Sequence, residues 1–194
     1  AIGAHLEHRS SPVRRAADIG CGAGPGGILV AKARPEAGVF MGDINDAALR
    51  FARVNAALAG AGNAVARRSD LLAGAPGDPF DLVVANPPYL VDPAERAYRH
   101  GGGPLGAGLS LAILDAALGR LAPGGTLLLY TGAAVVNGHD PFRAEAEGRL
   151  AAHPGVGWAY REMDPDVFGE ELGTAAYAEA DRIAAVVLTA TRKG

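Results

Sequence analysis

The residues Asn86-Pro87-Pro88-Tyr89 combine types that can hold a flat amino group, and they directly follow an apolar run, "FDLVVA" (80–85). Proline rings fix φ, and Pro87 also biases Asn86 toward an extended backbone, so this turn is stiff before anything binds. The amide oxygen of Asn86 and the adjacent backbone carbonyls can accept both hydrogens of an NH2 group. The ring of Tyr89 can lie against the flat π system of that group.

The chemistry that such a turn favours is attack by a planar amino nitrogen. The nitrogen of an amide or aromatic amine is a poor nucleophile because its lone pair is delocalised. When acceptors hold both hydrogens out of plane, the lone pair can attack an electrophilic methyl group, and the acceptor dipoles stabilise the developing positive charge. Positioning can supply about 7–11 kcal/mol of the barrier. We therefore expect Asn86, Pro87 and Tyr89 to form a catalytic site that needs no general base before methyl transfer; the alternative is a turn merely stiffened by proline.

A second stretch, "DIGCGAGPGG" (18–27), places glycines after another apolar run. Gly20, Gly22 and Gly24 let the backbone turn tightly and approach a ligand with no Cβ in the way. The stretch also satisfies the G-x-G-x-x-G pattern, so a nicotinamide or flavin dinucleotide is an alternative ligand. Asp18 argues against a dinucleotide, because a carboxylate attracts a cationic group, such as the α-ammonium of S-adenosylmethionine, and repels a pyrophosphate.

Two further acids follow apolar runs. Asp43 comes directly after 38–42 and can accept hydrogen bonds from both hydroxyls of a ribose. Its alternative role is an acid that caps the following helix. Asp70, within "RRSDLL" (67–72), can accept a hydrogen bond from an adenine amino group, with Leu71 against the ring. An ordinary loop acid is the alternative for Asp70.

Short apolar runs alternate with helical patterns, and they are the elements that must position these motifs. Strands are expected at 16–19, 38–42, 64–67, 80–85, 126–131, 156–163 and 182–190. The alternation predicts a Rossmann-like, doubly wound α/β fold with a mostly parallel seven-stranded sheet. No helical pattern separates the last two runs, which predicts an antiparallel edge strand. Ligands of such sheets bind outside the carboxyl ends of strands, where every motif above is expected to lie.

Helical spacing accounts for the segments between the strands. Helices are expected at 26–33, from Asn45 or Asp46 to about Gly60, at 111–121 and at 141–152. In the second of these, Phe51, Val54 and Leu58 share one face. Two polar connections remain: 92–108 is either a lid or a mobile loop, and the acidic segment 162–173 either attracts a basic substrate to the pocket mouth or is simply solvated.

Composition bounds the class of protein. The 194 residues are 49% hydrophobic and 20% charged, so we expect one globular domain over residues 1–194. The net charge of −3 gives no electrostatic reason for non-specific nucleic-acid binding. The one cysteine, Cys21, fits a reducing compartment, and the histidines lack metal-ligand spacing, so no metal is expected. Without a signal peptide or long apolar stretch, we expect a cytoplasmic protein with no membrane partner.

The segments "DIGCGAG", "GDIN", "SDLL" and "NPPY", in this order and spacing, resemble the class I S-adenosylmethionine-dependent methyltransferases that modify planar NH2 groups. The run that ends in "LAPGGTLLLYTG" (121–132) is similar to the release-factor glutamine N5-methyltransferase family, and the resemblance covers about residues 16–132. Two features depart from the bacterial members of that family: their helical N-terminal domain is missing, and no clear "FEP" segment follows "NPPY". Because the chain starts at Ala1 without a methionine, we expect an N-terminal recognition segment to be absent or trimmed.

The resemblance implies S-adenosylmethionine as the cofactor and a set of residues that contact it. These are Asp18, Gly20, Gly22 and Gly24 at the methionine end, Asp43 and Ile44 at the ribose, Asp70 and Leu71 at the adenine, and Asn86 beside them. It also implies that Asn86 and the Pro87 carbonyl grip the substrate amide while Tyr89 packs over it.

The preferred hypothesis is methyl transfer to a protein glutamine side chain, with a peptide release factor as the possible partner. Within the enzyme class, the alternative is a nucleic-acid adenine or guanine N-methyltransferase, for which a basic groove flanking Asn86 would be the sign. From another class comes a cofactor-binding subunit that needs a partner for its substrate. A dehydrogenase would instead bind NAD.

Overall fold

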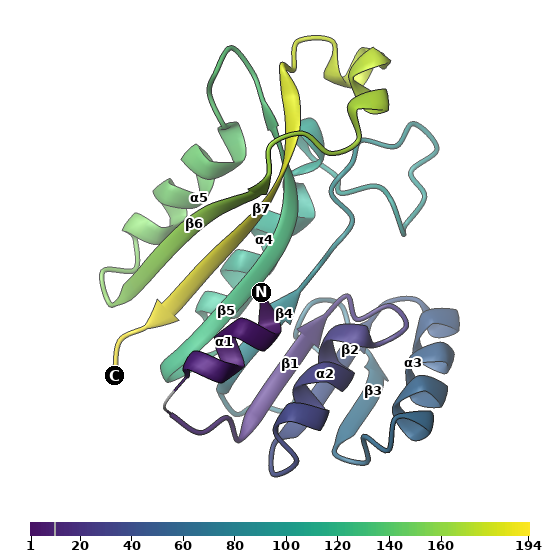
Figure 1. The fold of residues 1–194 in the computed structure, drawn as a ribbon, viewed down its shortest axis with the longest axis vertical. Coiled ribbons are helices and arrows are strands. Elements are labelled where there is room, and N and C mark those ends of the chain that lie inside the picture. Colours follow the sequence, from purple (N-terminus) through teal and green to yellow (C-terminus); the bar gives the residue numbers. More distant parts are fainter. Residues whose placement is uncertain (10) are drawn as a thin grey trace.

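One sheet of seven strands organises the chain, and its strand order is β3-β2-β1-β4-β5-β7-β6 (Figure 1). The structure is a computed structural model that describes residues 1–9 and 11–194. The strands are β1 (Arg15–Ile19), β2 (Gly38–Asp43), β3 (Ala64–Arg68), β4 (Phe80–Ala85), β5 (Leu121–Val135), β6 (Val156–Asp164) and β7 (Arg182–Arg192). β1 to β5 pair in parallel, and β7 runs antiparallel to both of its neighbours.

The predicted Rossmann-like fold is confirmed, and the sheet shows where its antiparallel strand lies. β7 is that strand, and it lies one place in from the edge, while β6 occupies the edge itself. The central strands β1 and β4 are buried along most of their length, because helices cover both faces of the sheet.

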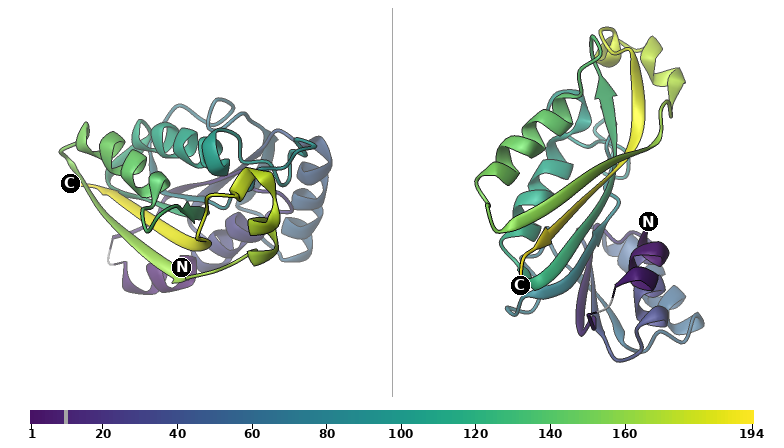
Figure 2. Two further views of the ribbon diagram at one scale, coloured as in Figure 1. Left: turned by 90° about the horizontal axis from the view of Figure 1, so that it is seen from above. Right: turned by 60° about the vertical axis from the view of Figure 1, so that its left-hand side comes forward.

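Five helices cover the two faces of this sheet. They are α1 (Ile2–His8), α2 (Pro25–Ala33), α3 (Asp46–Leu58), α4 (Gly108–Leu118) and α5 (Pro141–Ala151). Figure 2 shows α4 and α5 on one face and α1 and α2 on the other, and α3 shares the apolar core of α2. Three short 3₁₀ helices complete the elements: η1 (Pro104–Gly106), η2 (Gly169–Gly173) and η3 (Ala175–Tyr177). The leucine spacing overran the end of α4, because Leu121 already belongs to β5.

Alternation along the strands builds two cores rather than one. On β5, Leu127 and Leu129 pack into the core that holds α4 and α5. Leu128, between them, packs into the core that holds α2 and α3. Each of these leucines is almost fully buried, which stabilises the fold by about 1.5–3 kcal/mol per side chain.

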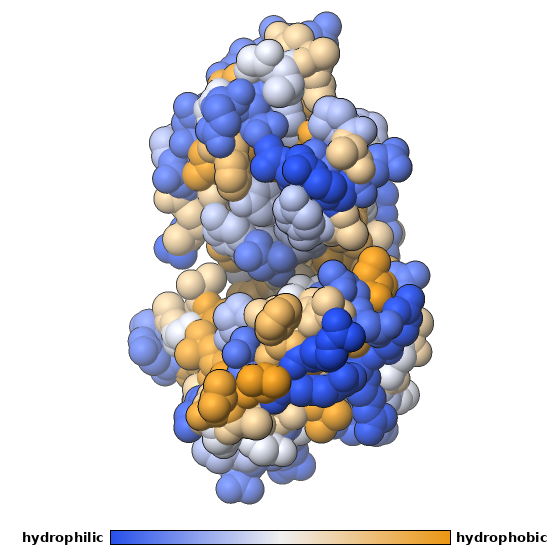
Figure 3. All heavy atoms as spheres, turned by 90° about the vertical axis from the view of Figure 1, so that its right-hand side faces the viewer, coloured by the Kyte–Doolittle hydropathy of each residue, from blue (hydrophilic) through white to orange (hydrophobic). Residues whose placement is uncertain are grey.

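The apolar stripe expected on α3 is real, but it faces solvent. Phe51, Val54 and Leu58 are 65%, 55% and 82% exposed, whereas the buried face is made by Leu49 and the small residue Ala52. Figure 3 looks onto this side of the molecule, where apolar side chains appear in the lower part. Among residues 1–9 and 11–194, no helix combines the length and apolar character needed to cross a bilayer.

The sheet has its topological switch beside β1. The chain runs outward from β1 to β2 and β3, then returns to β4 on the other side of β1. Connections that leave in opposite directions open a crevice at the carboxyl ends of these strands. The predicted motifs meet at this crevice, since Gly20 follows β1 and Asn86 follows β4.

Candidate active site

Two cavities open at the carboxyl edge of the sheet, and they meet at Asn86. One, here called the NPPY cavity, has a volume of about 470 Å³ and is lined by Asp43, Asp70, Asn86 and Tyr89, among others. The other, here called the glycine-bend cavity, has a volume of about 770 Å³ and is lined by Asp18 and the bend after β1. Asn86, Gly20 and Gly22 line both cavities, so the two cavities adjoin one another at these residues. In Figure 3, a hollow separates the upper part of the molecule from the lower part.

The bend after β1 needs glycine because its backbone is left-handed. Gly20, Gly22 and Gly24 have φ of 65°, 54° and 86°, which other residues rarely adopt. A Cβ on Gly20 or Gly22 would meet no atom within 4 Å, so both face open space. Gly24 instead is the N-cap of α2, where an added Cβ would lie 3.3 Å from Met41 and Ala52, and it lines neither cavity. Of the three glycines expected at the cofactor, only Gly20 and Gly22 therefore reach the site.

Two carboxylates hold the bend. Asp18 is 5% exposed and lines the glycine-bend cavity, where its Oδ2 accepts a hydrogen bond from the Gly27 amide at 2.6 Å. Burial raises the pKa of Asp18 to about 7, and the nearby charge of Asp43 acts in the same direction, against the hydrogen bond from Gly27. Asp43 accepts hydrogen bonds from the amides of Gly22 and Asn45, both at 2.8 Å. Asn45, rather than Asp43, caps α3 through its own side chain.

A tight turn after β3 brings Asp70 and Leu71 to the NPPY cavity. Leu71 is left-handed, with φ of 48°, and Ile44 lies in the same lining. Buried Ser69 holds the turn: its hydroxyl donates to the Leu71 carbonyl at 2.8 Å and accepts from the Gly74 amide at 3.0 Å. Sequence reasoning missed this serine, although a small hydroxyl residue next to a loop acid is a known turn-former.

Asn86 points toward the cavities and away from the apolar interior. It is exposed, whereas Ala85 before it and Pro87 after it are buried. The change follows from the end of β4: Ala85 still pairs with β1 and β5, and the next residue leaves the sheet. The structure therefore brings Asn86, Pro87 and Tyr89 to one lining, and the expected cofactor residues in the same lining are Gly20, Gly22, Asp43, Ile44, Asp70 and Leu71. Asp18 lines only the glycine-bend cavity.

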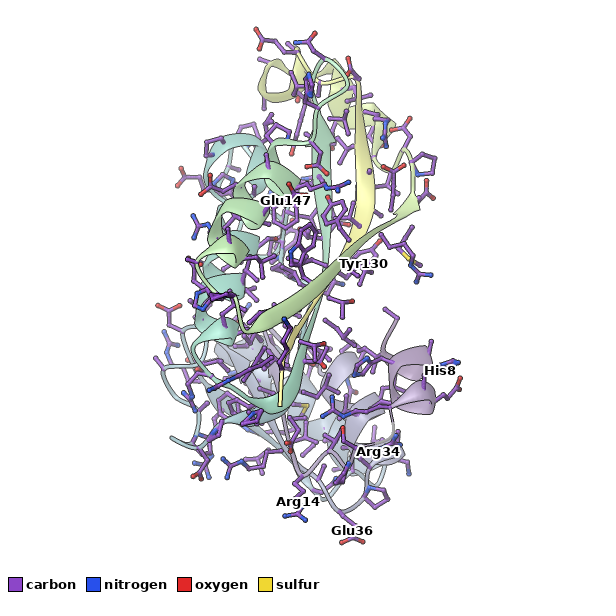
Figure 4. All side chains as sticks on the ribbon, turned by 90° about the vertical axis from the view of Figure 1, so that its left-hand side faces the viewer. His8, Arg14, Arg34, Glu36, Tyr130 and Glu147 are labelled. Atoms are coloured by element: carbon purple, nitrogen blue, oxygen red, sulfur yellow. The ribbon has the colours of Figure 1, made fainter. Side chains whose placement is uncertain are left out.

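The ring of Tyr89 occupies a space that the rest of the chain leaves for it. A Cβ on Gly132 of β5 would collide with this ring. Tyr130 meets the ring edge-on, with centroids 6.4 Å apart, and Phe168 lies at 5.9 Å. Burial, and next the neighbouring Tyr130, raise the pKa of Tyr89 to about 12, so its hydroxyl stays neutral. Figure 4 shows Tyr130 near the middle of the molecule, on the side that carries α1.

Residues 92–108, expected as a lid or a mobile loop, lie in a segment whose two ends are tied together beside the NPPY turn. The Leu90 carbonyl accepts from the Gly101 amide at 2.8 Å, and the Gly101 carbonyl accepts from the Leu109 amide at 2.7 Å. Asp92 is 2% exposed and accepts two hydrogen bonds from the Arg96 guanidinium, at 2.6 and 2.8 Å. These bonds hold the pKa of Asp92 well below its usual range. These hydrogen bonds hold the segment against the residues that directly follow the NPPY turn.

Besides Ser69, four aromatic or charged residues that line the cavities escaped sequence reasoning: Tyr98, Arg99, Tyr130 and Phe168. Phe168 belongs to the acidic segment 162–173, for which a position at the pocket mouth and a solvated loop were the two alternatives, and Phe168 itself lines the NPPY cavity. None of the four lies in a motif with its own spacing, and each reaches the site through packing between distant segments. Within the residues that the structure describes, no cluster of three or more His, Cys, Asp or Glu side chains forms a metal site.

Comparison with known proteins identifies the family. Residues 3–140 match the family described as methyltransferase small domain. The chain is 38% identical over 140 residues to the release factor glutamine methyltransferase of Xylella fastidiosa, covering 66% of this chain and 49% of that protein. It is 37% identical over 171 residues to the protein of the same name from Deinococcus radiodurans, covering 81% and 55%. The chain thus spans about half the length of these curated relatives.

Solved structures share the fold. The crystal structure of TrmN from Thermus thermophilus superposes with a TM-score of 0.65 at 21% identity, covering 98% of this chain and 48% of that one. The O-methyltransferase from Bacillus cereus in complex with SAH gives a TM-score of 0.57 at 15% identity, covering 93% and 74%. The fold, the motifs and the sequence match agree, and the chain belongs to the methyltransferase small domain family.

Proposed function

We propose that this chain transfers a methyl group from S-adenosylmethionine to the side-chain amide of a protein glutamine. The observation that carries the proposal is that Asn86 lines both cavities, so one residue can contact a methyl donor and a methyl acceptor. Relatives named for glutamine methylation of release factors and of ribosomal protein uL3 support glutamine as the acceptor. We propose residues 1–194 as the single methyltransferase domain.

The donor set of the cavities fits S-adenosylmethionine, the methyl donor of class I methyltransferases. Gly20 and Gly22 leave open space where any side chain would project into the site. The buried carboxylate of Asp18 suits a cationic group, and a carboxylate at the end of β2, Asp43, suits ribose hydroxyls. When bound, this cofactor supplies an electrophilic methyl group on a sulfonium.

Ile44, Asp70 and Leu71 complete this proposed cofactor site on the side of the adenine. Leu71 and Ile44 offer apolar contact for a ring, and exposed Asp70 offers an acceptor for an exocyclic amino group. Gly24 has no direct contact in this proposal, because it packs behind the bend.

The role of the NPPY turn is to orient the acceptor. The amide oxygen of Asn86 and the carbonyl oxygen of Pro87 each accept a hydrogen bond from one of the two N–H groups of the glutamine amide. The Tyr89 ring, fixed by Gly132 and Tyr130, covers the flat face of that amide. These contacts reduce the conjugation between the nitrogen lone pair and the carbonyl of the same amide. They also stabilise the positive charge that develops on the nitrogen during methyl transfer.

The charges around the site favour a protein over a nucleic acid. The charged side chains that line the NPPY cavity are Asp43, Asp70 and Arg99. Arg99 is ion-paired with Glu171, so the described lining offers no basic groove for a phosphate backbone. This observation gives no support to the nucleic-acid alternative.

A methyl-transfer assay with labelled S-adenosylmethionine tests the proposal. A peptide carrying one glutamine in a flexible loop should be labelled, whereas the same peptide with asparagine, an RNA and a DNA oligonucleotide should not. Replacement of Asn86 by alanine should lower kcat by about 100-fold or more, because a misplaced reactant costs that much. The Kd for S-adenosylhomocysteine, measured by calorimetry, should stay within about threefold of the wild type, since Asn86 has no charge to offer the cofactor.

Each outcome of the assay separates one alternative. Labelling of a nucleic acid alone would replace glutamine by a base as acceptor. Binding of S-adenosylhomocysteine without transfer to any substrate would favour a subunit that needs a partner. Unchanged turnover in Asn86→Ala would remove the role assigned to this side chain.

A further inference from the structure

The connection between β6 and β7, residues 165–181, lies at the carboxyl edge of the sheet. Because β7 runs antiparallel to β5 and β6, it begins at the edge where β5 ends. Figure 1 shows this connection at the upper right, coloured yellow-green, with the short helices η2 and η3. The family match covers residues 3–140, so it says nothing about this segment.

Two contacts attach the segment to the chain that follows the NPPY turn. The Tyr177 side chain is 1% exposed, and its hydroxyl accepts a hydrogen bond from the Val91 amide at 2.9 Å. Glu171 forms an ion pair with Arg99. Val91 lies two residues beyond Tyr89, and Arg99 lies in the segment that supports the NPPY turn. The segment is therefore anchored to the same structure that positions Tyr89.

Phe168 is the residue of this segment that reaches the site. It lines the NPPY cavity together with Asn86, and its ring lies 5.9 Å from that of Tyr89 at an angle of 58°. Its φ of 57° is left-handed, a conformation that a bulky residue adopts only under strain. A glycine would suit this backbone better, and Gly169 is the next residue. A phenylalanine thus occupies a position whose left-handed backbone conformation favours glycine.

We propose that Phe168 is a specificity-determining residue that admits a thin acceptor to Tyr89 and excludes a ring-shaped one. A third ring between two aromatic faces needs a separation of about 7 Å, twice the contact distance of carbon atoms. The two rings here are closer than that and tilted, so they cannot sandwich a nucleobase or another aromatic amine. An unbranched methylene stem that ends in an amide is slimmer and can pass along the edge of Phe168.

The inference rests on the proposed function, and it deepens that function by naming what selects the acceptor. Two peptides of otherwise identical sequence provide the test: one carries glutamine, and the other carries 4-aminophenylalanine, whose amino group is planar and attached to a ring. The wild type should methylate the glutamine peptide and discriminate against the aromatic one. Methyl transfer is measured for both peptides with the wild type, Phe168→Ala, Phe168→Gly and Phe168→Tyr.

Removal of the ring should raise KM for the glutamine peptide about tenfold, because the binding free energy of one aromatic contact corresponds to about a tenfold change in affinity. The change in kcat should be smaller. The preference in kcat/KM for glutamine over the aromatic amine should fall by at least about tenfold. Phe168→Tyr should retain both properties of the wild type. Phe168→Gly suits the left-handed backbone, so it keeps the test valid if Phe168→Ala does not fold.

Phe51→Ala is the matched control, because Phe51 is an exposed phenylalanine on α3 that lines neither cavity. It should leave KM and the acceptor preference unchanged. A folded Phe168→Gly variant with the acceptor preference of the wild type would overturn the inference alone. A wild type that labels neither peptide would overturn the proposed function, and the inference with it.

Discussion

The bend after β1 and the surroundings of Tyr89 both depend on glycine, and the space that glycine leaves is used differently in each. At Gly20 and Gly22, a Cβ would meet nothing within 4 Å. At Gly132, a Cβ would collide with the Tyr89 ring, and at Gly101 it would come within 2.8 Å of the Tyr89 Cα. One region keeps space open, and the other has filled that space with its own atoms.

The two regions should therefore fail in different ways when they are changed. Around Tyr89 an added atom has nowhere to go, so the fold and the orientation of the acceptor suffer together. In the bend an added atom enters the cavity, so binding of a ligand suffers, and the left-handed backbone of Gly20 and Gly22 adds strain to the fold without a collision. Glycine in a sequence cannot by itself tell these situations apart, because both look like a flexible turn.

Gly132→Ala should give the largest effect. The new methyl group displaces the Tyr89 ring, which should destabilise the fold by about 1–3 kcal/mol and lower methyl transfer by about 100-fold. Denaturant unfolding and turnover on a glutamine peptide measure the two changes. The Kd for S-adenosylhomocysteine should stay near the wild-type value, since Gly132 lines neither cavity.

Gly157→Ala is the matched control for this variant, because Gly157 also lies in a strand and a Cβ there meets nothing within 4 Å. It should leave both stability and turnover close to those of the wild type. Equal behaviour of the two variants would break the distinction drawn between filled and open space.

Asp43→Ala should act on the opposite side of the site. Its carboxylate fixes the amides of Gly22 and Asn45, and it faces the NPPY cavity. Loss of these charged hydrogen bonds should raise the Kd for S-adenosylmethionine by about 10–100-fold, as measured by calorimetry. Asp46→Ala removes an exposed acid three residues away and should leave the Kd unchanged. A normal dissociation constant in Asp43→Ala would remove the role proposed for this residue.

The last expected effect is a pH dependence of stability on the glycine-bend side, which should vanish well below pH 3.8, where Asp18 is largely protonated in both the folded and the unfolded state. The pKa of Asp18 is raised by burial from 3.8 to about 7, so the folded state keeps this proton when the unfolded state has lost it. The stability that Asp18 contributes is therefore full below pH 3.8 and is lost as pH rises toward about 7. Tyr89, with a pKa of about 12, stays neutral over the same range.

Asp18→Asn should remove this dependence. Relative to the variant, the wild type should lose on the order of 4 kcal/mol of unfolding free energy between pH 4 and pH 8. Chemical denaturation at a series of pH values measures the difference. Parallel curves for the two proteins would show that Asp18 does not titrate in this window.

The sequence predicted those parts of the fold and site that depend on neighbouring residues. The motifs after β1, β2, β3 and β4 could be found because parallel strands bring their carboxyl ends together. Gly132 and Phe168 could not be found, because each matters only through contact with Tyr89, which is distant in sequence. Helical spacing predicted that Phe51, Val54 and Leu58 share a face, but spacing cannot say whether that face meets the sheet.

The reversed direction of β7 has a consequence for how such a domain can diversify. Because β7 is reversed, the connection before it lies at the carboxyl edge of the parallel strands. This connection comes later in the chain than the loops after β1 to β4, which carry the residues proposed to bind the methyl donor. Residues 165–181 connect β6 to β7 and so lie outside the parallel part of the sheet formed by β1 to β5. Under the proposed function, the segment between β6 and β7 can therefore change the choice of acceptor, while the residues proposed to bind the methyl donor, which follow β1 to β4, stay the same.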